Sequence, residues 1–386
     1  MIENATCDHI RSQVVFSCFI VDSVLKSQNI GNRLIIDNLK GNIKMSFTYL
    51  RQLPSPGEIK VSYPLSEEKK ALKIKRDKEI ADIITGADNR FLCIIGPCSA
   101  DSEEPVMEYV HRLEKVAKKV EDKVLVIPRV YTNKPRTTGE GYKGIATQPD
   151  PEKAPDMVAG LIAVRSLLIR VIEETGLMPA DEMLYPENWE YVSDLLSYVA
   201  VGARSVEDQQ HRLTVSGFDV ASGMKNPTSG DFSVMLNSVY AAQHPHHFTF
   251  RGYEVDTTGN PLAHVVLRGA VSKHGNTVQN YHYEDLIRLK EMYDKMELVN
   301  PAAIIDSNHS NSGKKYEEQI RIVKEVMHNR KISEDIRKLV KGVMIESYLL
   351  PGSQHIGDHE FGRSITDPCL GWEESEQLIY DIAREV

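Results

Sequence analysis

The sequence predicts an α/β protein built as a (β/α)8 TIM barrel, with an N-terminal extension and an added β-hairpin near the sixth strand. From about residue 89 onward, short apolar runs typical of buried strands alternate with amphipathic stretches typical of helices. Eight such runs can be counted, which is the number of strands that closes this type of barrel. Polar residues capable of chemistry follow each run, as they do where barrel strands end.

The individual elements follow from these patterns. A capped helix is expected between Ser66, a good N-cap residue, and Gly86, a good stop signal. The predicted strands cover residues 91–95, 124–128, 178–184, 199–203, 217–222, 263–267, 302–306 and 342–347. The predicted helices between them cover residues 103–120, 155–175, 188–198, 206–213, 231–243, 281–297, 313–329 and 373–385.

Three regions make up the predicted domain organisation. Residues 89–386 form the TIM-barrel catalytic domain, and residues 45–88 form an N-terminal extension of strand and helix. A second methionine, Met45, opens a segment of different character from the one before it. We therefore expect translation to start at Met45, which would make residues 1–44 an extension that is not translated.

The predicted hairpin lies next to the sixth strand. Residues 248–255 and 261–267 would form its two strands, and the Gly-containing segment 256–260 would form its turn. Together with residues 45–65, this hairpin is either an oligomeric or regulatory surface or a simple excursion of the chain. The sequence favours neither interpretation.

Composition narrows the class of protein. Hydrophobic residues make up 41% and charged residues 26% of the chain, as in ordinary globular proteins. The formal net charge of −9 argues against non-specific binding to nucleic acid. Five cysteines, odd in number and widely spread, suit a reducing cytoplasm. No apolar run is long enough to span a membrane, so we expect neither nucleic acid nor membrane as a partner.

A cationic segment, residues 129–144, follows the second predicted strand. Its cations stand among prolines, threonines and glycines, so a turn-rich backbone carries them. The segment is either a cradle for a small anion or an ordinary solvated basic loop. Residues 139–144 match the dinucleotide pattern G-x-G-x-x-G, but no helix start follows, so a flexible flap is the better interpretation.

The residues that follow the eight strands form two chemical groups. Because the carboxyl ends of barrel strands meet at one mouth, residues far apart in the sequence become neighbours there. The cations need an anion between them, and they are Arg129, Lys134, Arg136, Arg204, Lys225 and Arg268. The potential metal ligands are Cys98, His309, Glu346 and Asp367.

The ligand set is mixed in chemistry. A thiolate, an imidazole and two carboxylates suit Mn²⁺, Fe²⁺, Co²⁺ or Zn²⁺, and differ from the closed Cys/His tetrad of structural zinc sites. The alternative is that each residue is structural. Cys98 would then be a small core side chain, His309 a satisfied polar group, and Glu346 and Asp367 ion-pair partners of arginines.

Several of these segments together resemble the class I 3-deoxy-D-arabino-heptulosonate 7-phosphate (DAHP) synthases. The similarity runs in order from about residue 66 to the end of the chain. The matching motifs are Gly96-Pro97-Cys98-Ser99, Lys134-Pro135-Arg136-Thr137-Thr138, Gly202-Ala203-Arg204, Arg268-Gly269, Asp306 through His309, and Ser364-Ile365-Thr366-Asp367.

The resemblance implies a metal-dependent transferase of the shikimate pathway, which leads to chorismate and the aromatic amino acids. Such an enzyme condenses phosphoenolpyruvate with D-erythrose 4-phosphate and water to give DAHP and phosphate. One divalent metal ion per subunit would be held by Cys98, His309, Glu346 and Asp367. The metal would polarise the aldehyde of the sugar phosphate, and Cys98, His309 and Lys134 are the residues expected to be catalytic.

The substrate contacts are also implied by the resemblance. Phosphoenolpyruvate would be held by the cations Arg129, Lys134, Arg204, Lys225 and Arg268, with Glu182 nearby and Ala203 beside Arg204. Erythrose 4-phosphate would meet Lys134, Pro135, Arg136 and Thr137. Lys134 lies between both substrates and is the expected proton donor to the new alkoxide. A homodimer or homotetramer and inhibition by an aromatic amino acid are implied as well.

Two other functions compete with this one. A 3-deoxy-octulosonate 8-phosphate synthase would share the barrel and the phosphoenolpyruvate site but take a longer sugar, whereas the Lys-Pro-Arg-Thr segment favours the four-carbon aldehyde. A non-catalytic regulatory barrel would have no need of all four metal-ligand candidates. The departures from the family pattern are the long loop Thr138–Gly144 and Ala270 after Gly269, and neither removes a charged residue.

Overall fold

The structure is a computed structural model that describes residues 47–386. The predicted extension 1–44, and with it the predicted start at Met45, lies outside the described residues. The described chain divides into two compact units between Pro64 and Leu65. Within it, no helix combines the length and the apolar character needed to cross a membrane.

The first unit contains helix α2 (Pro56–Ser62). Ser55 caps this helix, since its hydroxyl accepts from Glu58 N at 3.2 Å while the Glu58 carboxylate accepts from Ser55 N at 2.7 Å. This reciprocal pair satisfies two backbone donors that a helix start leaves free. Residues 47–88 therefore contain two helices, α2 and α3 (Glu67–Thr85), and the strand expected there is not found in this described stretch.

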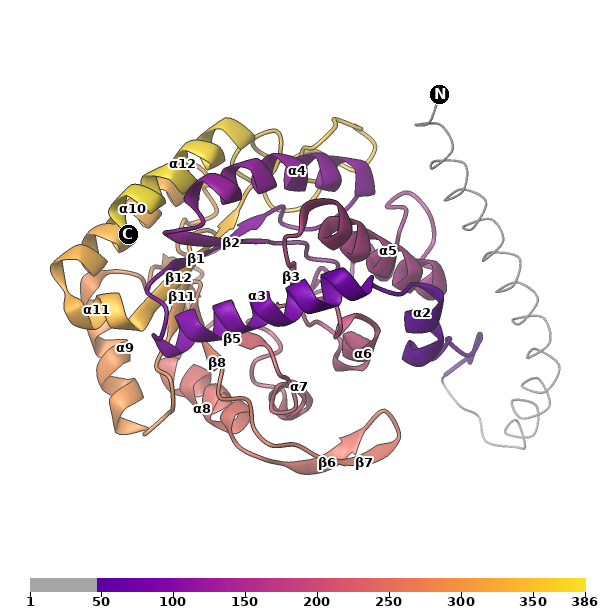
Figure 1. Cartoon of the computed structure of the whole chain (residues 1–386), viewed down its shortest axis with the longest axis horizontal. Helices are drawn as coiled ribbons and strands as arrows, with labels where there is room; N and C mark the ends of the chain where they lie inside the picture. Colours follow the sequence, from indigo (N-terminus) through magenta and orange to yellow (C-terminus); the bar gives the residue numbers. More distant parts are fainter. Residues whose placement is uncertain (1–46) are drawn as a thin grey trace. The chain divides into compact units, whose positions relative to one another are not determined.

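The second unit is the predicted parallel barrel. In Figure 1 its strands lie at the centre and helices surround them. The eight strands are hydrogen-bonded in the order β2, β1, β12, β11, β8, β5, β4, β3. Their bounds are β1 (Phe91–Gly96), β2 (Val124–Pro128), β3 (Ala180–Glu182), β4 (Tyr198–Val201), β5 (Ala221–Lys225), β8 (Ala263–Leu267), β11 (Ala303–Asp306) and β12 (Val340–Glu346). The barrel closes where Val130 N, just after β2, donates to Ala180 O at 2.9 Å.

Along each barrel strand, successive side chains point alternately into the barrel interior and toward the surrounding helices. In β1, Leu92 and Ile94 belong to the cluster inside the barrel, whereas Phe91, Cys93 and Ile95 pack with the surrounding helices. Because both faces are buried, strands such as β1 and β2 are apolar throughout, as parallel strands usually are, whereas β3 contains Asp181 and Glu182 and β5 ends at Lys225. This is the physical reason why continuous apolar runs marked the strands in the sequence.

Helix α3 covers one end of the barrel, across which it runs in Figure 1. Ile80, Ile83 and Ile84 of α3 belong to the same buried cluster as the barrel interior. The predicted boundaries are confirmed: Ser66 caps the first turn, and Gly86 ends the helix with a left-handed φ of 86°. Helix α3 belongs to the same compact unit as the barrel.

The remaining helices alternate with the strands, as predicted. They are α4 (Glu103–Val120), α5 (Met157–Thr175), η1 (Pro186–Asn188), α6 (Trp189–Val192), α7 (Gln209–Val215), α8 (Phe232–Gln243), α9 (Tyr283–Lys295), α10 (Glu318–Ile332), α11 (Glu334–Leu339) and α12 (Trp372–Glu385).

Some boundaries differ from the prediction. The expected helix 188–198 is reduced to η1 and α6, because Leu195 and Leu196 turn inward and Ser197 N donates to Pro179 O at 3.2 Å, which starts β4. Strand β5 begins at Ala221 and not near 217. Residues 218 and 220 are apolar and buried, but they pack as part of a loop, and an apolar run alone cannot distinguish a loop from a strand.

The added hairpin exists, but its turn was placed wrongly. Strands β6 (His247–Phe250) and β7 (Tyr253–Asp256) pair antiparallel around Arg251 and Gly252, whose φ values are 51° and 80°. Positive φ at both central positions is typical of a two-residue hairpin turn. The predicted turn 256–260 instead leads into the barrel strand β8. A second small hairpin, β9 (Ala270–Val271) with β10 (Thr277–Val278), was not predicted.

Candidate active site

A cavity of about 330 Å³ lies where the barrel strands end. All eight barrel strands contribute to its wall, either through their last residue or through the loop that follows, and the C-terminal loop around Asp367 completes it, as expected for the mouth of a barrel. Every site residue predicted from the sequence is part of this wall. They are Cys98, Arg129, Lys134, Pro135, Arg136, Thr137, Glu182, Ala203, Arg204, Lys225, Arg268, His309, Glu346 and Asp367.

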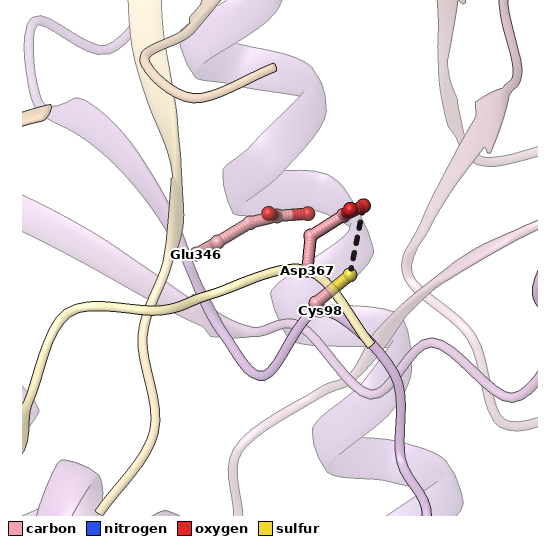
Figure 2. Close-up of side chains that lie close together, drawn as sticks. All are labelled: Cys98, Glu346 and Asp367. Atoms are coloured by element: carbon pink, nitrogen blue, oxygen red, sulfur yellow. Dashed lines mark hydrogen bonds between the residues drawn. The ribbon is translucent and has the colours of Figure 1, made fainter. Parts of the chain in front are cut away.

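The potential metal ligands gather on one side of the cavity. Ligand atoms of Cys98, Glu346 and Asp367 all lie within 4.8 Å of one another, and Figure 2 shows the three side chains converging. The strand register explains part of this arrangement, because β1 and β12 pair Gly96 with Glu346 and so bring Cys98 beside that carboxylate. The sulfur of Cys98 lies 3.6 Å from Asp367 Oδ2.

His309 approaches this group from the loop after β11. Its Nε2 lies 3.8 Å from Glu346 Oε1, and its other ring nitrogen, Nδ1, lies 2.9 Å from Asp306 Oδ2. A carboxylate at the second nitrogen is the usual device that orients a metal-binding imidazole. His309 also has a left-handed backbone with φ of 49°, a conformation that costs energy for a residue other than glycine.

The chemistry of this donor set fits a divalent transition metal. One sulfur and two carboxylates converge, and the His309 imidazole lies beside them, next to Glu346, without joining this group of three. Asn308 Nδ2 donates to Glu346 Oε2 and so holds that carboxylate in place. Burial, reinforced by Glu346, raises the pKa of the Cys98 thiol to about 11. Mutual repulsion among these groups favours a cation between them.

Lys134 reaches the same group. Its Nζ lies 2.6 Å from Cys98 Sγ and 2.8 Å from Asp367 Oδ2. Burial alone would lower the pKa of this ammonium, but Cys98, Asp367 and Glu346 outweigh burial and raise the pKa above its usual value. Lys134 is therefore a charged donor at the edge of the metal-ligand group.

Arg129 connects the metal-ligand group with the cations that can bind an anion. Its Nη2 donates to Glu346 Oε1 at 2.6 Å and to Cys98 O at 3.1 Å, and its guanidinium lies 3.8 Å from the centre of the Tyr131 ring. Its Nε and Nη1 are buried without a hydrogen-bond partner in the described part of the chain, as is Nη1 of Arg268. Buried donors without acceptors are costly, so these arginines are ready to bind an anion.

A second charged pair stands beside these arginines. Lys225 Nζ donates to Glu182 Oε2 at 2.8 Å and lies 3.9 Å from Asp306 Oδ2. Burial would raise the pKa of Glu182, but Lys225 and Arg129 outweigh burial and lower it. Gly202 fits closely over this carboxylate, since a Cβ there would lie 2.6 Å from Glu182 Oε1. A side chain at this position, just before Ala203, would therefore push against the Glu182 carboxylate that binds Lys225.

The cationic segment forms a compact loop at the edge of the cavity. Lys134 N donates to Lys143 O at 3.0 Å, and Arg136 Nε donates to Tyr142 O at 2.7 Å. Gly144, with φ of 95°, packs so closely that a Cβ would lie 2.3 Å from Thr132 O. No helix begins directly after Gly144, so the segment lacks the geometry of a dinucleotide loop.

Several residues of this site were not predicted individually. Asp306 orients His309, Asn308 holds Glu346, and Tyr131 lies under Arg129. Lys314 lines the cavity from the loop after β11. The sequence did show that these residues follow predicted strands, which places them near the mouth of the barrel. Their individual partners, however, depend on the three-dimensional arrangement.

Comparison with known proteins gives the same assignment over most of the chain. A family model described as the DAHP synthetase I family matches residues 63–379. The Tyr-sensitive phospho-2-dehydro-3-deoxyheptonate aldolase of Escherichia coli is 34% identical over 343 residues, which cover 86% of this chain and 93% of the relative. The Corynebacterium glutamicum protein of the same name is 32% identical over 370 residues, covering 91% and 96%.

A solved structure has the same fold. The phospho-2-dehydro-3-deoxyheptonate aldolase of Francisella tularensis superposes with a TM-score of 0.82 at 33% identity, covering 88% of this chain and 98% of that one. Sequence family, relatives and fold agree over the whole barrel, including the loops that form the cavity. This chain belongs to the DAHP synthetase I family.

Proposed function

We propose that this chain condenses phosphoenolpyruvate with D-erythrose 4-phosphate and water to give DAHP and phosphate, the first step toward the aromatic amino acids. Membership of the DAHP synthetase I family supports this reaction. The structural observation that best supports this reaction at the cavity is the position of Arg129. One nitrogen of its guanidinium holds Glu346, while two others are buried and free to bind an anion.

Phosphoenolpyruvate carries a carboxylate and a phosphate, both of which suit arginine. The free donors of Arg129 and Arg268, with Lys225 and Arg204 beside them, can bind these two groups. The backbone around Ala203 lies in the same wall, and Glu182 holds Lys225 in position. Binding in this enclosed region strengthens each charge interaction because water is largely excluded.

Erythrose 4-phosphate would bind at the cationic loop. Lys134, Pro135, Arg136 and Thr137 form one continuous part of the cavity wall, and Thr137 is more exposed to solvent than Lys134. We assign the phosphate of the sugar to Arg136 and Thr137. Its aldehyde then lies toward Lys134 and the metal-ligand group, next to the phosphoenolpyruvate site.

The reaction also requires an electrophilic aldehyde. Cys98, His309, Glu346 and Asp367 would hold one divalent ion, chosen from Mn²⁺, Fe²⁺, Co²⁺ and Zn²⁺. When bound, such an ion supplies Lewis-acid polarisation of a carbonyl oxygen. The residues of the chain position that ion beside both substrates.

Bond formation then follows from proximity. C3 of phosphoenolpyruvate attacks the aldehyde carbon, water adds at C2, and the bond between C2 and the phosphate oxygen breaks to release phosphate. The aldehyde oxygen becomes an alkoxide and needs a proton. Lys134 is charged and lies between the two substrate regions, so we assign it as the donor. The cations allow two polyanions to approach within reacting distance.

We also propose how this chain is regulated and how it assembles. The Escherichia coli relatives include proteins named Tyr-sensitive and Phe-sensitive. We assign this chain an aromatic amino acid as a feedback inhibitor, and a homodimer or homotetramer as its assembly. Activity measured with phenylalanine, tyrosine or tryptophan added separately identifies the inhibitor.

A phosphate-release assay tests the proposed function. The purified chain should release phosphate only when both phosphoenolpyruvate and erythrose 4-phosphate are present, should lose activity on chelation, and should recover with Mn²⁺ or Fe²⁺. A five-carbon aldose phosphate in place of erythrose 4-phosphate tests the longer-sugar alternative. Turnover with the five-carbon sugar and none with erythrose 4-phosphate would contradict the proposal. No turnover with either sugar after metal addition would support the non-catalytic alternative.

A further inference from the structure

A buried carboxylate, Asp181, lies in the middle of β3 (Ala180–Glu182), outside the cavity wall described above. Only 4% of this residue is exposed to solvent. Asp181 Oδ1 accepts from Thr132 N at 2.8 Å and from Glu182 N at 2.7 Å, while Oδ2 accepts from Thr132 Oγ1 at 2.5 Å. One side chain therefore joins the segment after β2 to the end of β3.

These side-chain contacts connect the segment after β2 to strand β3 beyond the point where backbone hydrogen bonds between them end. The bond from Val130 N to Ala180 O is the last backbone link between the segment after β2 and strand β3 in the described chain. Two residues further on, Thr132 N finds its acceptor in the Asp181 side chain. The carboxylate thus replaces the backbone acceptor that a longer β3 would have supplied.

Beyond Thr132 the chain is held chiefly by its own loop. Thr132 O accepts from Ala146 N at 3.1 Å, and Lys134 N donates to Lys143 O at 3.0 Å, so both bonds lead to the other side of the same loop. Asp181 is accordingly a side-chain link that ties this segment to the rigid barrel just before Lys134, beyond the backbone bond from Ala100 N to Tyr131 O at 2.7 Å. Lys134 in turn contacts Cys98 and Asp367.

The same carboxylate acts on the neighbouring strand. By accepting from Glu182 N, it orients the residue whose own carboxylate binds Lys225 at 2.8 Å. Two cations of the proposed substrate site, Lys134 and Lys225, are therefore both positioned through Asp181. Neither Asp181 nor Thr132 lines the cavity itself.

We propose that Asp181 is a positioning residue for the condensation, which holds Lys134 and the Glu182–Lys225 pair in register with each other at the cavity. This inference rests on the proposed function. Asp181 does not touch the substrates. It acts through the backbone N–H and the hydroxyl of Thr132 and through the backbone N–H of Glu182.

The test compares two substitutions at this position. Asp181→Ala removes both acceptor oxygens, and with them three hydrogen bonds, and leaves two buried backbone N–H groups unpaired, so kcat/KM for phosphoenolpyruvate should fall by about 30-fold. Asp181→Asn has the same size and keeps an oxygen toward the two N–H groups, so it should stay within about fivefold of wild type. Rescue by the conservative variant distinguishes positioning from a need for charge.

A matched control separates positioning from general loss of stability. Asp194 binds the buried Arg165 at 2.7 Å and does not line the cavity. Asp194→Ala should lower the melting temperature as Asp181→Ala does, yet leave kcat/KM within about twofold of wild type at a temperature where the protein is folded. If Asp181→Ala loses no more kcat/KM than this control, the proposal is wrong.

A second variant tests the same contact from the other side. Thr132→Val removes the hydroxyl that donates to Asp181 but keeps the backbone N–H. It should lower kcat/KM, and its effect should be smaller in the Asp181→Ala background because both changes break one shared contact. If Asp181→Ala does not fold, Thr132→Val alone tests the proposal. Wild-type kcat/KM in Thr132→Val would then overturn the proposal. Absence of turnover in the wild type would instead refute the proposed function.

Discussion

At the scale of single residues, the site depends on side chains that each have two tasks. Arg129 holds Glu346 with one nitrogen and offers two buried donors to an anion. Its guanidinium lies over the Tyr131 ring, 3.8 Å from the ring centre, and Lys225 lies over the same ring. A movement of Arg129 would therefore disturb the metal-ligand group and the anion site together.

The metal ligands can be tested one at a time. Cys98→Ser and His309→Ala should each abolish metal retention, because the remaining donors are too few to hold a divalent ion tightly. Metal content per chain after gel filtration measures this. Cys93→Ala is the matched control, since Cys93 lies on β1, the strand just before Cys98, but packs among the helices, and it should retain metal. Stoichiometric metal in Cys98→Ser would contradict its assignment as a ligand.

The residues that sequence could identify are those whose chemistry is recognisable in isolation. Cys98, His309, Glu346 and Asp367 stood out because a thiol, an imidazole and carboxylates at strand ends indicate a metal. Asp181 gave no such signal, because its importance lies in the distance from its carboxylate to Thr132. That distance depends on how far β3 extends, which the sequence pattern did not determine.

At the scale of elements, the two ends of the barrel have separate roles. The loops after the strands carry the cavity, while α3 closes the interior with Ile80, Ile83 and Ile84. Stability and chemistry are therefore divided between opposite ends, as is general for this fold.

This division predicts the effect of a substitution in α3. Ile83 is fully buried in the barrel interior, so Ile83→Ala should lower the free energy of unfolding by about 2–5 kcal/mol. Ile74→Ala is the control on the same helix, since Ile74 is 72% exposed and should change stability by less than about 0.5 kcal/mol. Chemical denaturation measures both. Equal stability of the two variants, or loss of kcat/KM in folded Ile83→Ala, would contradict this role of α3.

Element boundaries were predictable where local signals act, and not elsewhere. The caps of α3 are local, because Ser66 and Gly86 act on their own helix. The shortening of the helix after β3 and the start of β5 depend on tertiary packing, which brings apolar residues of a loop into the core. The hairpin turn was misplaced because Arg251 has a positive φ, which a sequence does not reveal for an arginine.

At the scale of the whole molecule, an acidic protein encloses a basic cavity. The formal net charge is −9, yet six of the cations predicted from the sequence line the cavity mouth. Screening by salt limits the reach of exposed charges to about 8 Å at physiological ionic strength, so the local cations dominate for a substrate that has entered. The fold gathers these cations from loops that are far apart in the sequence.

The central claim is that this cavity joins two anionic substrates through a new carbon–carbon bond. Mass spectrometry of a mixture of the purified chain, Mn²⁺, phosphoenolpyruvate and erythrose 4-phosphate tests it most directly. The account predicts a seven-carbon sugar phosphate and one equivalent of free phosphate for each phosphoenolpyruvate consumed. Consumption of phosphoenolpyruvate without a seven-carbon product would contradict it.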